Sequence, residues 1–454
     1  MYNDFTKYLS AQRNETIVKV SKSDIIYPQT LIDLQTAFDS ILKEFQKGKY
    51  VFVAAGILEG NENKEEANLF NTVFGRDGLI MLDFYQSIKH TNKLIVPDNL
   101  ARSTLEFMAS YQGVEHSQAS EEELGKIFHE YRDYNDPIAV ELAKSRGWAF
   151  PYYGGVDTTF HYIKQLSHHL ITHPEDKNYN ILNHKNSVNY TFEESLMLAY
   201  EYTKSTIKGN LVQYHRLNSG GIEIQSWRDS YDSISNHEGE LPSFEKDLAL
   251  LDLQMIALEA YESIKLVMPI TKHKEIDILI AKLKQGLELM WVPMEKGGFY
   301  GSGIQEDKIF DTVTSTNLIL LQSDFITDEH KKAIFDHCYP LLNVTNGIAT
   351  LGTNENRYHI SGYHTGNVWL FDNVLCYQGL ISSGYDIEAA QLKSKIINII
   401  SQTNCYPELV GSTDVPNQYM IDVLDNDSSR YNRVCQPGQP LQGWTIMAIA
   451  SLLS

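Results

Sequence analysis

Apolar side chains recur at spacings of three and four residues along almost the whole chain. The clearest runs extend from Leu31 to Phe45, from Leu248 to Leu258 and from Ile276 to Met290. This period places apolar side chains on one face of a helix, whereas a half-buried strand would alternate at every second residue. The sequence therefore predicts an all-α fold built from one helix after another.

Shorter runs of the same kind predict further helices, and about twelve helices are expected in total. Asp98 and Thr327 stand where their side chains could cap the first amides of two of them. No low-complexity linker divides the chain, so residues 1–454 are expected to form a single domain, with residues 1–50 as a leading extension and first helix. The further helices are expected at residues 77–89, 98–111, 156–171, 191–207, 328–341, 366–381, 386–402 and 441–453.

The formal charge of −20 disfavours two classes of partner. Nucleic acids and anionic membranes would both be repelled, whereas a neutral polar ligand such as a sugar would not. The N-terminus has no apolar signal region, and no apolar run is long enough to span a bilayer. A cytoplasmic protein is expected, although export without a cleaved signal stays open. The glutamate-rich stretch Ser117–Glu123 is expected on the solvated surface.

Metal and cofactor signals are weak. His168 and His169 lie on an expected helix without the ligand spacing of a zinc site. The cysteines form no Cys-x-x-Cys pair, so they are expected to be buried free thiols. Neither a metal ion nor a cofactor is expected. The four cysteines are Cys338, Cys376, Cys405 and Cys435.

Two carboxylates far apart in the sequence have unusual aromatic or conformationally restricted neighbours. Asp229 follows Trp227 and Arg228, and Glu408 follows Pro407. Two carboxyl groups brought together across a sugar-binding cleft can hydrolyse a glycosidic bond, because one protonates the leaving oxygen and the other takes a proton from water. Taken alone, Asp229 could equally cap a turn, Asp232 is a neighbouring alternative, and Pro-Glu begins many ordinary helices.

Between the expected helices lie loop motifs rich in Gly, Tyr, Trp and Asp. Together and in this order they resemble the catalytic domain of the amylo-α-1,6-glucosidase (glycogen debranching) family and, more loosely, glucoamylases and other (α/α)6 glycosidases, over roughly residues 50–454. The stretch from Cys435 to Trp444 departs from the family, which has a shorter motif there. The motifs are Phe74–Ile80, Pro151–Thr159, Trp227–Ser230, Tyr363–Trp369, Pro407–Leu409 and Gln442–Trp444.

The resemblance implies a toroid of six inner and six outer helices, with the active site on the loops. It implies that Asp229 is the general acid and Glu408 the general base of an inverting hydrolysis, which requires no cofactor. Any one of the aromatic residues could equally belong to the core, and Asp77 could simply cap a helix. The residues that the resemblance places in substrate binding are Arg76, Asp77, Tyr152, Tyr153, Asp157, Trp227, Arg228, His364, Trp369, Gln442 and Trp444.

The expected function is the release of terminal glucose from glycogen- or starch-type α-glucans, with the α-1,4 or α-1,6 linkage left open. A second possibility is hydrolysis of a small glycoside, such as trehalose or a glucosyl- or mannosyl-glycerate, on the same fold. An isomerase or epimerase on a similar toroid would instead use histidines as acid and base. A carbohydrate-binding protein without catalysis is the non-enzyme alternative.

Overall fold

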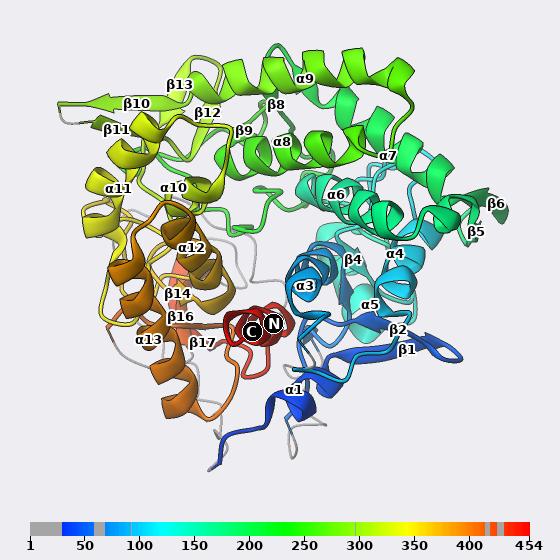
Figure 1. Ribbon diagram of the computed structural model, residues 1–454, viewed down its shortest axis with the longest axis horizontal. Helices are drawn as coiled ribbons and strands as arrows, with labels where there is room; N and C mark the ends of the chain where they lie inside the picture. The colour runs from blue at the N-terminus through cyan, green and yellow to red at the C-terminus, as the bar shows by residue number, and fades with distance from the viewer. Residues whose placement is uncertain (1–29, 59–68, 92, 296, 414–417, 425–430) are drawn as a thin grey trace. The chain divides into compact units, whose positions relative to one another are not determined.

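The computed structural model describes residues 30–454 except 59–68, 92, 296, 414–417 and 425–430, with backbone alone for 418–424 and 431–437 (Figure 1). In this described part, thirteen α-helices dominate and the strands are short. The chain divides into two compact units. Among the described residues, unit 1 comprises 30–37, Arg228–Ser243 and Met290–Leu453, and unit 2 comprises Phe38–Trp227, Phe244–Leu289 and Ser454.

Helix α6 is central to unit 2, where it packs against α3, α7 and α8 (Figure 1). One face of α6 carries the buried side chains of Phe160, Ile163 and Leu166. Helix α8 also packs against α9. The helices of unit 2 are α3 (Gly75–Ile88), α4 (Leu100–Ser110), α5 (Pro137–Arg146), α6 (Asp157–Thr172), α7 (Phe192–Ser205), α8 (Leu251–Lys265) and α9 (Ile270–Glu288).

A charged side chain on α6 also ties this helix to its neighbours. Lys164 Nζ lies 2.7 Å from Asp83 Oδ2 on α3 and 2.8 Å from Glu259 Oε2 on α8. The lysine side chain is 14% exposed. One cation therefore bridges two carboxylates from two different helices.

The strands of unit 2 form short antiparallel hairpins and ladders. The pairs are β1 (Leu42–Gln46) with β2 (Lys49–Phe52), β3 (Val73–Phe74) with β4 (Glu130–Tyr131), β5 (Asn180–Asn183) with β6 (Val188–Thr191), and β7 (Ile207–Lys208) with β8 (Leu211–Val212). A short 3₁₀ helix, η2 (Pro174–Asn178), follows α6, and β9 (Ala249–Leu250) precedes α8.

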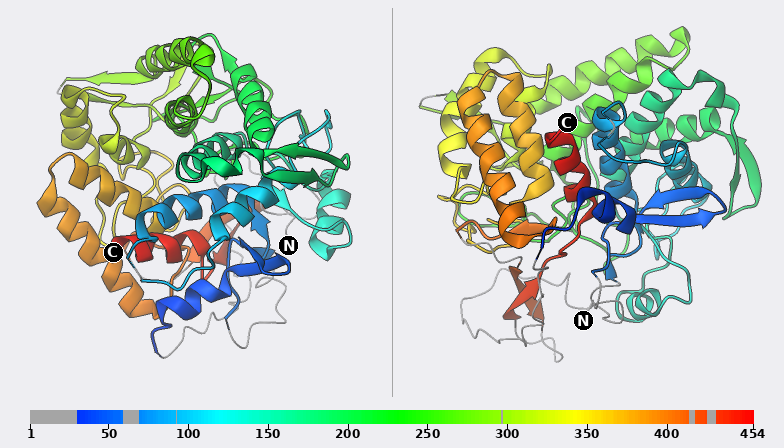
Figure 2. Two further views of the ribbon diagram at one scale, coloured as in Figure 1. Left: turned by 45° about the vertical axis from the view of Figure 1, so that its right-hand side comes forward. Right: turned by 60° about the horizontal axis from the view of Figure 1, so that its bottom comes forward.

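In unit 1, α12 packs against α10, α13 and α14, and Figure 2 shows α12 and α13 side by side. Helix α14 is apolar around most of its circumference, and accordingly nearly all of its residues are buried. The helices of unit 1 are α10 (Thr316–Ile319), the 3₁₀ helix η3 (Leu320–Gln322), α11 (Asp328–Leu342), α12 (Leu370–Ser382), α13 (Asp386–Thr403) and α14 (Gly443–Leu452).

Short antiparallel pairs also occur in unit 1, and one of them positions the candidate site. In that pair, β14 (Val368–Trp369) lies beside β15 (Leu409–Val410), with Trp369 opposite Leu409. The other pairs are β10 (Trp291–Met294) with β11 (Gly297–Tyr300), β12 (Gly303–Gln305) with β13 (Lys308–Phe310), and β16 (Gln418–Leu424) with β17 (Tyr431–Pro437).

The helical prediction is confirmed for the long periodic runs, with two differences. The run from Leu31 to Phe45 is helical only in α1 (Leu34–Ser40), because Leu42–Gln46 forms β1 and Gly48, at φ +73°, turns the chain into β2. Helix α5 was not expected, although Asp136 accepts a hydrogen bond from the Ile138 amide as its N-cap. Its exposed, weakly amphipathic sequence gave little periodic signal.

Of the two predicted caps, one is confirmed. The Thr327 side chain accepts a hydrogen bond from the His330 amide, 3.2 Å away, at the start of α11. Asp98 is not a cap, since α4 follows Asn99 and has no side-chain cap. Cys338, Cys376 and Cys405 are buried free thiols, as expected, while the Cys435 side chain lies outside the described part. None of the helices described is both long and apolar enough to span a membrane.

Candidate active site

Both predicted carboxylates belong to unit 1. Asp229 comes from the segment Arg228–Ser243, and Glu408 comes from the loop between α13 and β15. The negative charge of Asp229 contributes to a raised pKa of Glu408, so the two groups interact electrostatically. Two carboxylates that the sequence holds far apart therefore act on each other within a single unit.

Glu408 is buried, with 3% of its surface exposed. Its Oε1 accepts a hydrogen bond of 2.7 Å from the Tyr363 hydroxyl, and its Oε2 accepts one of 2.8 Å from the Gln439 amide. Burial raises the pKa of Glu408 to about 7, the bonds from Gln439 and Tyr363 oppose this, and the charge of Asp229 adds to it. Both protonation states are therefore populated near neutral pH, which suits a group that exchanges a proton.

The backbone on either side of Glu408 is held by unit 1. The Thr445 hydroxyl donates to the Pro407 carbonyl at 3.0 Å, and the Gln442 amide donates to the Tyr406 carbonyl at 3.0 Å. The Glu408 amide itself donates to the Gln439 carbonyl at 2.7 Å. These bonds fix the carboxylate through the main chain as well as through its oxygens.

Asp229 is half-buried and lies between two anchored residues. The Arg228 guanidinium donates from Nη1 to the Thr316 hydroxyl and from Nη2 to the Ser315 hydroxyl, each at 2.7 Å. On the other side, the Ser230 amide and hydroxyl lie 3.3 and 2.9 Å from His364 Nδ1. Asp232, the alternative acid, is also half-buried in the turn that follows.

The rest of the segment Arg228–Ser243 is tied to later parts of unit 1. The His237 amide donates to Asp311 Oδ1 at 2.9 Å, and His237 Nδ1 lies 2.8 Å from Glu355 Oε2. Arg357 Nε donates to the Gly239 carbonyl at 2.7 Å. The loop that carries Asp229 is therefore bonded to its surroundings along its whole length.

Aromatic side chains of the predicted site pack against one another in unit 1. The Trp369 ring lies 4.9 Å from the His364 ring and 5.8 Å from the Trp444 ring, and Trp444 stacks on Phe371 at 4.2 Å. Trp369 and Trp444 are 1% and 4% exposed. Gln442, beside Trp444 in sequence, is likewise buried.

The remaining predicted residues lie in unit 2, where two of them form an ion pair. Arg76 donates from Nε to Asp157 Oδ2 at 2.5 Å and from Nη2 to Asp157 Oδ1 at 3.1 Å. Arg76 is the second residue of α3 and Asp157 the first of α6. Both are buried, as is Asp77. Burial raises the pKa of Asp157, and the guanidinium of Arg76 opposes this. Arg76 thus forms a two-pronged ion pair with Asp157, which the sequence did not predict.

Tyr152 and Tyr153 are fully buried in unit 2, and Trp227 is 9% exposed. The Tyr152 hydroxyl donates to Glu121 Oε1 at 3.0 Å, and its ring stacks on Trp148 at 3.8 Å. The Tyr153 hydroxyl donates to the Tyr111 carbonyl at 2.5 Å. Both phenols are therefore used in holding loops of unit 2 together.

Glu121 is a buried carboxylate that sequence reasoning missed. The stretch Ser117–Glu123 was expected in solvent, but Ser120, Glu121 and Glu122 are all buried. Besides Tyr152, Glu121 accepts hydrogen bonds from the Leu217 amide at 3.2 Å and from Gln225 Nε2 at 2.7 Å. The expectation was wrong because the partners come from a distant loop, and nothing in the local sequence distinguishes such a glutamate from a surface one.

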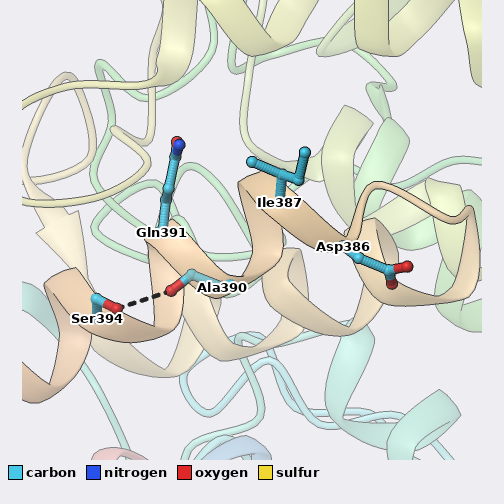
Figure 3. A pocket seen from close by; sticks show the side chains of 5 residues that line it. All are labelled: Asp386, Ile387, Ala390, Gln391 and Ser394. Carbon is cyan, nitrogen blue, oxygen red and sulfur yellow. Dashed lines mark hydrogen bonds between the residues drawn. The ribbon is translucent and has the colours of Figure 1, made fainter.

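A surface hollow on α13 is lined by none of these residues. Figure 3 shows that its lining comes from this one helix, with Ile387 and Gln391 on the same side. The full lining is Asp386, Ile387, Ala390, Gln391 and Ser394, and none of these was predicted to bind substrate. Among the described residues, no group of three or more His, Cys, Asp or Glu side chains is arranged to hold a metal ion.

Comparison with known proteins gives matches among solved structures. No family model matches the chain, and no curated protein matches it. An uncharacterized conserved protein from Thermus thermophilus aligns with a TM-score of 0.58 and 12% identity, over 92% of this chain and 99% of that one. A GH63 mannosylglycerate hydrolase from the same organism, in complex with glucose, aligns with a TM-score of 0.58 and 12% identity, over 93% of this chain and 100% of that one.

A structure of the GH63 mannosylglycerate hydrolase with Tris and D-glycerate aligns with a TM-score of 0.58 and 12% identity, over 92% of this chain and 99% of that one. The chain therefore shares the fold of these solved structures. The expected fold class is confirmed to that extent, since the described part is mainly helical with a few small sheets. Six inner and six outer helices remain a prediction.

Proposed function

We propose that this protein is a glycoside hydrolase that inverts configuration at the anomeric carbon. The observation that carries the proposal is the interaction between Asp229 and Glu408 in unit 1, with Glu408 buried and its pKa raised to about 7. Two carboxyl groups with different surroundings are what acid and base catalysis of glycoside hydrolysis requires. The shared fold with a mannosylglycerate hydrolase supports the same class of reaction.

In this mechanism Asp229 protonates the glycosidic oxygen while Glu408 takes a proton from the attacking water. Each Glu408 oxygen accepts one hydrogen bond, from Tyr363 or from Gln439, and a carboxylate oxygen has a second lone pair that can hold the water. In the structure, the negative charge of Asp229 raises the pKa of Glu408, so the mechanism requires that binding of the glycoside moves the single proton of the pair to Asp229. The mechanism requires carboxyl groups about 6.5–9.5 Å apart, whereas a retaining enzyme needs about 5 Å.

For the substrate, we propose a small glycoside, such as trehalose or a glucosyl- or mannosyl-glycerate. The support is the likeness to structures named mannosylglycerate hydrolase, two of which hold glucose or D-glycerate. The second candidate is the release of terminal glucose from α-glucans, which is supported by the resemblance of the loop motifs to those of debranching enzymes and, more loosely, glucoamylases. Both candidates use the same carboxylate pair.

The substrate-binding residues are proposed on the same basis. Gln442 Oε1 and Trp444 Nε1 are buried atoms without a hydrogen-bond partner among the described residues, so a sugar hydroxyl near them would satisfy both. His364 covers one face of Trp369 and Phe371 covers one face of Trp444, so a sugar ring is proposed to contact the opposite faces. The other proposed contacts are Arg76, Asp77, Tyr152, Tyr153, Asp157, Trp227 and Arg228. His364, which the resemblance also placed in substrate binding, bonds Ser230 instead. We also propose a single (α/α)6 toroidal domain, located in the cytoplasm.

The test is sugar release from trehalose, glucosylglycerate, mannosylglycerate, maltotriose, isomaltose and glycogen, with the anomer formed read by NMR. Wild type is compared with Asp229→Asn and Glu408→Gln, each expected to lose at least about 10²-fold in kcat. Formation of the β-anomer from an α-glycoside supports inversion, and the substrate hydrolysed fastest selects between the two candidates. Silence of the wild type on all six would overturn the proposal.

A glycoside with a dinitrophenyl leaving group assigns the two roles. Such a leaving group departs without protonation, so a variant without its general acid keeps activity on it, while a variant without its general base does not. We expect Asp229→Asn to keep this activity and Glu408→Gln to lose it. The opposite result would exchange the two roles.

A further inference from the structure

Two adjacent residues of unit 1, Tyr363 and His364, are hydrogen-bonded to Glu408 and to the neighbour of Asp229, respectively. The Tyr363 hydroxyl bonds Glu408 directly at 2.7 Å, and His364 Nδ1 bonds Ser230, the residue after Asp229, at 2.9 Å from its hydroxyl. We infer that this dipeptide is a positioning element that sets the spacing between Asp229 and Glu408. The inference rests on the proposed function and assigns His364 a role other than contact with the substrate.

The bond geometry fixes which form of His364 is present. The Ser230 amide can only donate, and it points at His364 Nδ1 from 3.3 Å. His364 Nδ1 must therefore accept, so the imidazole carries its proton on Nε2. In this form one nitrogen receives both the amide and the hydroxyl of Ser230, and the ring fixes the backbone as well as the side chain of that residue.

The effect on Asp229 follows from the chain geometry. Consecutive Cα atoms are about 3.8 Å apart across a planar peptide, so a residue between two fixed neighbours has little freedom. Arg228 is fixed by its bonds to Ser315 and Thr316, and Ser230 is fixed by His364. Asp229 is therefore held from both sides, and His364 provides one of the two anchors.

The dipeptide itself sits in a rigid turn. Trp369 Nε1 donates to the Tyr363 carbonyl at 2.7 Å, and the Trp369 ring lies nearly parallel to the His364 ring, at 15°. Gly366 has φ +155°, and a Cβ there would meet the His359 carbonyl at 2.0 Å, so this position requires glycine. Support of this kind is what keeps a catalytic arrangement at a fixed spacing.

One turn thus serves both carboxylates, through separable bonds. Loss of the His364 ring should release Asp229 and leave the Tyr363 bond to Glu408 in place. Loss of the Tyr363 hydroxyl should affect Glu408 and leave the Ser230 anchor in place. The two substitutions are therefore expected to cause different defects, one in the position of Asp229 and the other at Glu408.

The experiment compares His364→Ala with wild type on two substrates, the glycoside hydrolysed fastest by wild type and its dinitrophenyl counterpart. We expect kcat on the first to fall by roughly 10²-fold, because the acid is misplaced, with KM changed less than about threefold. On the dinitrophenyl glycoside, which needs no acid, kcat should stay within about threefold of wild type. His364→Asn, which keeps an acceptor near the Nδ1 position, should recover part of the loss.

His359→Ala is the matched control. His359 Nδ1 also accepts a hydrogen bond from a backbone amide, that of Ser361 at 3.2 Å, in the same stretch of chain. This bond joins His359 to Ser361 and involves neither Asp229 nor Glu408 or their direct neighbours, so His359→Ala should change neither kcat nor KM. Ser230→Ala removes the hydroxyl from the other side of the link and should give a smaller loss with the same selectivity.

Crystal structures of wild type, His364→Ala and His359→Ala provide a readout that does not need activity. The inference predicts that the distance between the Asp229 and Glu408 carboxyl groups changes in His364→Ala alone. An unchanged distance, an equal loss on both substrates, or a rise in KM alone would overturn it. If wild type hydrolyses neither substrate, the proposed function fails, and the distance comparison still decides whether His364 positions Asp229.

Discussion

At the scale of the residue, the Tyr363 hydroxyl is expected to control the pH at which Glu408 becomes a base. Its hydrogen bond lowers the pKa of Glu408, which burial and Asp229 raise to about 7. Tyr363→Phe removes this bond, so the pKa should rise further by about one unit, the worth of one hydrogen bond to a charged group. The rising limb of the plot of kcat against pH should move to higher pH by that amount.

Tyr377→Phe is the control for this shift, because Tyr377 is a half-buried tyrosine of α12 for which no contact with Glu408 occurs in the structure. The rising limb of kcat against pH for Tyr377→Phe should coincide with that of wild type. A limb that moves to lower pH in Tyr363→Phe would contradict the role of Glu408 as base.

Glu408 should also reduce the stability of the folded protein at alkaline pH. Its folded pKa of about 7 lies above the ordinary value of 4.5, so its contribution to stability is complete below pH 4.5 and is lost as the pH rises through 7. The loss amounts to about 3 kcal/mol for this one group. Glu408→Gln, which stays neutral, should therefore have the higher free energy of unfolding in urea at pH 8.

The same comparison at pH 4.5 supplies the control. There Glu408 is protonated, so wild type and Glu408→Gln should unfold at nearly the same urea concentration. A variant that is less stable than wild type at pH 8 would mean that the carboxylate is stabilised by its surroundings, contrary to the direction of its pKa.

The sequence predicted residues better than it predicted their partners. Asp229 and Glu408 were predicted from their neighbours and from the resemblance of the loop motifs. Both belong to unit 1, and their role in catalysis stays a prediction. The ion pair of Arg76 with Asp157 and the bond of His364 to Ser230 were not predicted. Such bonds join distant parts of the chain, and a single sequence contains no signal for which loop will meet which.

At the scale of the element, long periodic helices were predictable and short ones were not. Helices such as α8, α9 and α13 bury one face over several turns, and this gives the spacing of three and four that the sequence shows. The hairpin β1–β2 was missed because Ile41 and Phe45 fit the same spacing while the turn at Gly48 decides the structure. The short strand pairs, of two residues in several cases, are set by tertiary contacts.

The link between α3, α6 and α8 leads to a prediction about helix packing. Lys164→Met would leave Asp83 and Glu259 close together without the cation that bridges them. The expected loss is about 1–3 kcal/mol in the free energy of unfolding at pH 7, because the pair is partly exposed and therefore partly screened. Urea denaturation measures it.

The control for Lys164→Met restores charge balance without restoring the bridge. The triple variant Lys164→Met, Asp83→Asn, Glu259→Gln should recover much of the lost stability, since no unpaired carboxylate remains. If the triple variant is no more stable than Lys164→Met alone, the loss comes from packing of the lysine stem and not from charge.

At the scale of the whole molecule, the chain passes between its two units after Ala37, Trp227, Ser243 and Leu289. A single domain, as the sequence predicts, should unfold in one calorimetric transition with equal calorimetric and van't Hoff enthalpies. Two separate transitions would show that the units are independent domains. Differential scanning calorimetry on the full chain distinguishes the two results, and Lys164→Met, which lies in unit 2, should lower only one of two transitions.

The hydrogen bonds of the segment Arg228–Ser243 also determine when, during synthesis of the chain, the candidate site can assemble. Its partners Asp311, Ser315, Glu355 and His364 all come later in the chain, and Gln439, which bonds Glu408, comes later still. A ribosome makes the N-terminal part first, so Asp229 leaves the exit tunnel before any of these groups exists. A nascent chain therefore carries no complete carboxylate pair until translation is nearly finished, and a product terminated before Glu408 would lack the pair altogether.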